Sequence, residues 1–84
     1  SNLSDMSNGE RGKGKLYGER EKLMRMYERM KNELQTYENN IGFLSISSKG
    51  GGGLLKEMER KIDKLKNEMA LIIKKIDAID ENLE

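Results

Sequence analysis

Residues 55–83 decide the fold of this chain, and they read LKEMERKIDKLKNEMALIIKKIDAIDENL. Apolar side chains recur along this stretch in steps of three and four residues, at Leu55, Met58, Ile62, Leu65, Met69, Ile72, Ile76, Ile79 and Leu83. A mean step near 3.5 residues keeps the stripe on one face of an α-helix and favours a left-handed supercoil. The pattern predicts a helix over about 54–82 that needs a second apolar stripe to pack against.

A second stripe lies upstream. Its steps also alternate between four and three residues, at Leu23, Tyr27, Met30, Leu34, Tyr37, Ile41 and Leu44. This pattern predicts a helix over about 16–41, with Gly42 as its C-terminal cap. Arg20 occupies the stripe position between Leu16 and Leu23, where it either weakens the helix start or lies with its stem along the other helix.

The segment between the two stripes predicts how they meet. It ends in four consecutive glycines, Gly50 to Gly53, and each would cost a helix about 1 kcal/mol. We therefore expect a loop over about 42–53 and an all-α fold: an antiparallel two-helix coiled-coil hairpin, with pairing of two hairpins into a four-helix bundle as an extension. A continuous rod is the competing shape, because Leu44 and Leu55 share one heptad phase.

One register makes every layer of the hairpin apolar. It pairs Leu44 with Leu55, Ile41 with Met58, Leu34 with Leu65, Tyr27 with Ile72 and Leu23 with Ile76. The paired length would be roughly 40 Å at a rise of about 1.5 Å per residue. At the open end, basic residues (Lys15, Arg20, Lys22, Arg25) would lie beside acidic ones (Asp77, Asp80, Glu81, Glu84). The same register also predicts two like-charged neighbours, Lys31 with Lys66 and Glu33 with Glu68.

Composition argues against catalysis. The 84 residues carry a net charge of +1 and contain no His and no Cys, so the commonest general base and thiolate chemistry are missing. We expect no enzyme activity, no cofactor and no metal site. Residues 1–15 are polar and lack periodicity, which predicts a disordered or loosely ordered tail. No run of about 18 apolar residues exists, so we expect no membrane span and a cytoplasmic protein.

Apolar residues outside the stripes suggest contact surfaces. Met24, Met26, Leu71 and Ile73 map to the open end of the hairpin. They either widen the apolar stripe or form a second surface, for a symmetric homodimer or for other helices of a parent protein.

Phe43 and Ile46 lie in the predicted loop. They either plug the end of the core or dock another protein or domain.

Lys49 and Lys56 flank the glycine run and are weak candidates for anion contact. A phosphate-binding P-loop needs Lys and Ser or Thr directly after its last glycine, whereas Leu54 and Leu55 follow here. Nucleic-acid binding through basic helix faces and the Lys49 loop is the alternative function. The near-zero net charge counts against it.

Three short stretches of the sequence resemble those of a known protein family. They are Tyr37-Glu38-Asn39-Asn40-Ile41-Gly42-Phe43-Leu44, Ser47-Ser48-Lys49 and Leu54-Leu55-Lys56-Glu57-Met58. From about Leu16 to the C-terminus the chain resembles the C-terminal helical segment of large bacterial proteins, chiefly of the Bacteroidetes, in the domain-of-unknown-function family numbered 349. This resemblance implies a bacterial, intracellular, non-catalytic helical segment. We expect a structural or interaction module that mediates oligomerisation or protein contact.

Overall fold

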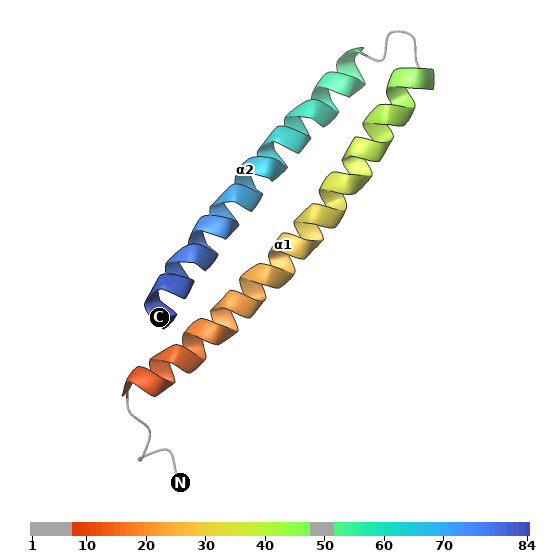
Figure 1. Ribbon diagram of the computed structural model, residues 1–84. Helices are drawn as coiled ribbons and strands as arrows, with labels where there is room; N and C mark the ends of the chain where they lie inside the picture. Colours follow the sequence, from red (N-terminus) through yellow and green to blue (C-terminus); the bar gives the residue numbers. More distant parts are fainter. Residues whose placement is uncertain (1–7, 48–51) are drawn as a thin grey trace.

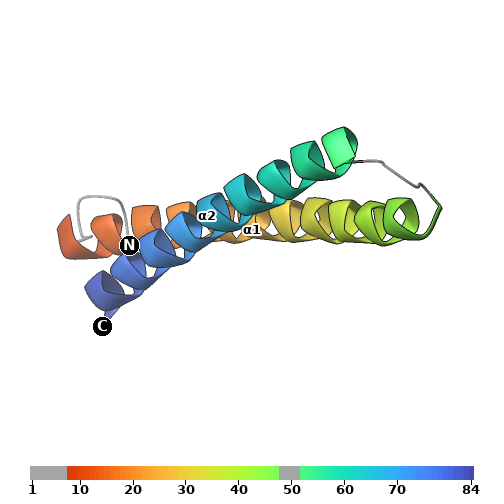
Figure 2. The same ribbon diagram turned by 90° about the horizontal axis from the view of Figure 1, so that it is seen from above.

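The computed structural model describes the backbone of residues 8–47 and 52–84, and the side chains of 10–45 and 53–84. Two helices, α1 (Asn8–Ser47) and α2 (Gly52–Leu83), run antiparallel side by side (Figure 1). They form a slender hairpin of 67 × 19 × 16 Å, and α2 lies obliquely across α1 (Figure 2). The predicted all-α helical hairpin is confirmed, and the continuous rod is wrong, because α2 folds back along α1.

The core follows the stripe on α2. Among the described side chains, those that are buried come from this stripe alone: Ile62, Leu65, Met69, Ile72, Ile76 and Ile79. The facing residues of α1, from Leu23 to Leu44, are all only half-buried. α1 therefore covers α2 more completely than α2 covers α1.

The predicted bounds of the first helix were wrong at both ends. α1 begins at Asn8 instead of about residue 16, and it continues through Gly42 to Ser47, so Gly42 is not a cap. Residues 10–15 mix good helix formers with two poor ones, Gly12 and Gly14. Glu10 in the first turn complements the positive end of the helix dipole. Packing of the apolar stripe on both sides of Gly42 outweighs the cost of one glycine.

Three differences follow from these bounds. The hairpin is longer than the predicted 40 Å because the start of α1 extends past the end of α2 (Figure 1). The segment between the helices is shorter than the predicted loop over 42–53, since α1 continues to Ser47 and α2 already begins at Gly52. The predicted tail is helical from Asn8 onward, while residues 1–7 and 48–51, including Lys49, lie outside the described residues.

Candidate interaction surface

An ion pair ties the open end of the hairpin. Arg20 Nε donates to Asp80 Oδ1 at 2.6 Å, and Arg20 Nη2 donates to Oδ2 at 3.4 Å. This hydrogen bond and the negative charge of Asp80 raise the pKa of Arg20. The side chain of Arg20 thus reaches across to α2 in a bidentate contact. This agrees with the sequence interpretation in which Arg20 lies along the other helix. The contact also fits the predicted register to within one residue, because Arg20 would lie opposite Ile79.

We expect this ion pair to orient the helices more than it stabilises them. Arg20→Ala or Asp80→Asn should lower the melting temperature by no more than a few degrees, since both side chains remain partly exposed. The double variant should lose little more than either single one, and the coupling should shrink in high salt. Circular dichroism melts of the four proteins at two salt concentrations measure it. Additive losses would show that the two residues do not interact in solution.

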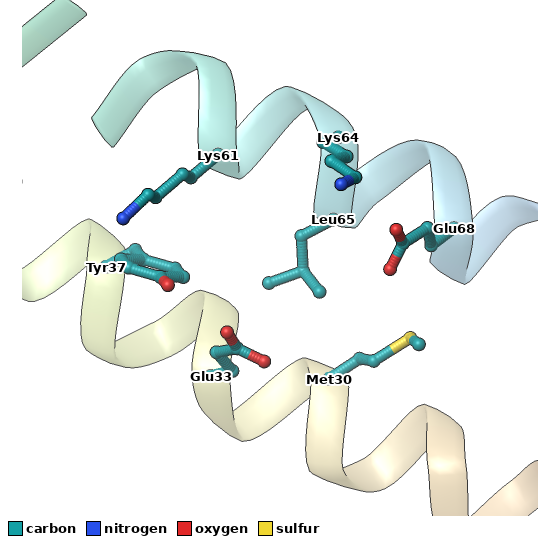
Figure 3. Close-up of a pocket in the computed structure, with 7 residues that line it drawn as sticks. All are labelled: Met30, Glu33, Tyr37, Lys61, Lys64, Leu65 and Glu68. Atoms are coloured by element: carbon teal, nitrogen blue, oxygen red, sulfur yellow. The ribbon is translucent and has the colours of Figure 1, made fainter. Parts of the chain in front are cut away.

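A groove lies between the two helices near the middle of the hairpin (Figure 3). It is lined by Met30, Glu33, Tyr37, Lys61, Lys64, Leu65 and Glu68. Glu33 and Glu68, a predicted like-charged pair, indeed share this groove. Lys61 and Lys64 line it too, so two cations lie among the two carboxylates and offset their repulsion.

Tyr37 and Glu33 interact inside this groove. A hydrogen bond to Glu33 raises the pKa of Tyr37 above its ordinary value of 10.0, with partial burial and the Glu33 charge adding to the effect. Because the pKa is higher in the folded chain, this contribution to stability is complete below about pH 10. It is lost as the pH rises through the folded pKa.

We therefore expect Glu33→Gln to lower the pKa of Tyr37. Absorbance titration of tyrosinate, in a chain with Tyr17→Phe and Tyr27→Phe, isolates this one hydroxyl. Glu38→Gln is the matched control, because Glu38 is an exposed carboxylate next to Tyr37 in sequence. An unchanged pKa in Glu33→Gln would mean that the hydrogen bond does not form in solution.

A second, more apolar groove lies nearer the open end. It is lined by Glu19, Lys22, Leu23, Met26, Lys75, Ala78 and Ile79. Ala78 lines this groove from α2 with only a methyl group, and Met26 lines it from α1. In heptad terms both grooves lie on the same side of the seam, the side of Met26, Glu33, Glu68 and Lys75.

The predicted contact residues divide between the two sides of the seam. Leu71 is 56% exposed and neighbours the groove side in the heptad wheel, as does half-buried Met26. Ile73 is 39% exposed and lies on the opposite side with half-buried Met24. Leu71 therefore lies on the same side of the seam as Met26, and Ile73 on the same side as Met24. The four residues do not form one patch.

The predicted plug at the hairpin tip was wrong. Phe43 is part of α1 and is 69% exposed, so it does not cap the core. The side chain of Ile46 lies outside the described residues. Lys56 is exposed on α2, and Lys49 is outside the described residues.

Sequence reasoning missed two exposed apolar residues, Tyr17 and Leu54. Both directly adjoin a stripe position, Tyr17 after Leu16 and Leu54 before Leu55. That adjacency was the available signal, but it also fits a side chain that merely widens the stripe.

Within residues 8–47 and 52–84, no group of acidic side chains is arranged to hold a metal ion. Neither helix has, over the same ranges, a stretch long and apolar enough to cross a membrane. Comparisons with protein-family models, with curated proteins and with solved structures found no match for this chain. The resemblance to the bacterial family therefore stays a prediction.

Proposed function

We propose that this hairpin is a non-catalytic coiled-coil module of a larger, cytoplasmic bacterial protein, and that it mediates oligomerisation or contact between proteins. The observation that carries the proposal is one-sided burial. α1 buries the stripe of α2, yet the α1 stripe itself is only partly buried. An apolar stripe that remains only partly buried on a marginally stable scaffold is best stabilised by a further protein surface.

The accessible area supports the same proposal. The chain exposes 6605 Å², whereas a compact folded protein of its mass, 9.6 kDa, exposes about 5,100 Å². The surplus of about 1,500 Å² exceeds the roughly 800 Å² that one partner contributes to a standard interface. The extended shape of the hairpin thus leaves more of its surface accessible than a compact fold of the same mass would.

Site-specific photo-crosslinking in the cells that make the protein tests the proposal. A photoreactive amino acid would replace Leu71, and in separate variants Phe43 or Ile73, which are exposed apolar positions. We expect a defined cross-linked protein band from at least one of these positions. Arg25 and Asn67 are matched exposed positions on the outer helix faces, and should give none.

Two results would contradict the proposal. One is the absence of cross-linked species at all three apolar positions. The other is equal cross-linking at the apolar and control positions, because random collision would then explain the products.

Binding of nucleic acid is the alternative, and the charge pattern favours it less. Basic side chains recur at helical spacing on one outer face of the first half of α1, at Arg11, Lys15, Lys22, Arg25 and Arg29. The net charge is nevertheless only +1, and on α2 acidic side chains lie among the basic ones. A steep fall in DNA or RNA affinity with rising salt would support this alternative. Absence of binding at low salt would remove it.

A further inference from the structure

Leu71 marks one long face of the hairpin. Its side chain is 56% exposed, although its neighbour Ile72 is among the most buried residues. Glu68 lies one turn before Leu71 and Lys75 one turn after it, both on the groove side of α2. We call the surface made by Glu68, Leu71, Lys75 and the adjoining α1 residues Lys22, Met26 and Glu33 the Leu71 face.

The charges of this face are self-complementary. A two-fold axis that crosses α2 near Leu71 reverses the direction of the helix in the second copy. Residues before Leu71 in one copy then face residues after Leu71 in the other. Glu68 of each copy consequently meets Lys75 of the other, and the two leucines pack against each other at the axis.

The same axis also pairs opposite charges on α1. In the hairpin register, Leu71 lies beside the stretch of α1 between Met26 and Met30. Lys22 precedes this stretch and Glu33 follows it, on the same side of the seam. Reversal by the axis brings Lys22 of one copy towards Glu33 of the other, within reach of two long side chains. One symmetry operation thus satisfies four charge pairs around the two leucines. Arg29, one heptad after Lys22, lies opposite Leu71 in the register set by Arg20 and Asp80, and is the like-charged residue that this axis brings near its own counterpart.

We propose that a second copy of this chain covers the Leu71 face and forms an antiparallel four-helix bundle. The inference rests on the proposed function, for which it names the partner. The uncovered area of each hairpin is sufficient, because an interface of standard size takes roughly 800 Å² from each copy. The apolar groove beside Met26 lies under this interface and is closed by it.

Charge reversal at two positions tests the pairing. We expect sedimentation equilibrium of the full chain to show a reversible dimer. Glu68→Lys and Lys75→Glu should each weaken the dimer by about tenfold, because each brings like charges together twice in the symmetric interface. The double variant Glu68→Lys/Lys75→Glu should restore the wild-type dissociation constant to within about threefold.

The charge reversals also have an internal check on folding. Within one hairpin, Glu68→Lys removes a carboxylate that shares a groove with Glu33. The new lysine, however, joins Lys61 and Lys64 in that groove, so the two effects oppose each other. We expect the helicity of Glu68→Lys to change little while its dimer weakens. If this variant loses helicity, Lys75→Glu serves as the test instead, because Lys75 is an exposed residue.

Cross-linking locates the axis. The chain contains no cysteine, so Leu71→Cys introduces a single thiol next to the proposed axis. We expect rapid formation of a disulfide-linked dimer under mild oxidation, since two facing Cα atoms near an axis can approach to within about 6 Å. Ile73→Cys is the matched control on the opposite side of the seam, and it should oxidise much more slowly.

The outcomes separate this inference from the function on which it rests. A monomer in sedimentation, together with cross-links to a different protein at Leu71, overturns the second copy but leaves the interaction module standing. A dimer that is insensitive to both charge reversals and oxidises equally at both cysteines overturns the Leu71 face. A monomer that cross-links to nothing overturns both proposals.

Discussion

Ile72→Asp is expected to unfold most of the chain at 25 °C. Ile72 is 4% exposed in the middle of the seam, and aspartate there would either bury a charge or force the helices apart. Loss of a buried Ile together with burial of a polar group costs about 3–5 kcal/mol. A two-helix scaffold of this size has about that much stability in total. The helical signal in circular dichroism should therefore collapse.

Ile73→Asp is the matched control for this experiment. It makes the same substitution at the next residue, where the side chain is 39% exposed. Because the new carboxylate can reach water, we expect a loss of no more than about 1 kcal/mol. Similar losses from the two variants would mean that the helices do not pack through the seam described above.

Gly18→Ala combined with Gly42→Ala should stabilise the hairpin by about 2 kcal/mol, since each glycine in a helix interior costs about 1 kcal/mol relative to alanine. Both glycines lie inside α1, and a methyl group at either position meets no neighbouring atom within 4 Å. The expected rise in melting temperature is about 8–16 °C. Thermal melts followed by circular dichroism measure it.

Gly12→Ala combined with Gly14→Ala is the control for position. These glycines also lie in open space, but they belong to the part of α1 that extends past the end of α2 (Figure 1). We expect more helix at low temperature and little change in the cooperative transition. A rise equal to that of Gly18→Ala/Gly42→Ala would indicate that the first turns of α1 are also covered by another surface.

The structural features behind these two predictions, the burial of Ile72 and the helical state of Gly42, differ in whether the sequence alone predicts them. The buried position of Ile72 was readable from the stripe on 55–83, because the spacing of apolar residues directly reports which helix face is covered. The helical state of Gly42 was not readable. Glycine is a common cap as well as a tolerated interior residue, and only packing on both sides of it decides between the two.

The candidate surface shows the same division. Exposed apolar side chains at Leu71 and Ile73 could be anticipated from their places outside the stripe. Their places on opposite sides of the seam also follow from their heptad positions. Which α1 residues lie beside each of them required the register, which the Arg20–Asp80 pair and the shared grooves supply. The sequence predicts Phe43 in a loop because Gly42 precedes it, so the helical state of Gly42 changes the predicted role of Phe43 as well.

The stripe from Leu55 to Leu83 by itself determined that this chain forms a long helix with one apolar face, because periodicity is a local property of the sequence. Only the tertiary structure decided that α1 begins at Asn8, that it passes through Gly42, and that its own stripe stays only partly buried. Those features depend on how the two helices pack against each other along one seam. No local pattern encodes that balance of packing against conformational cost.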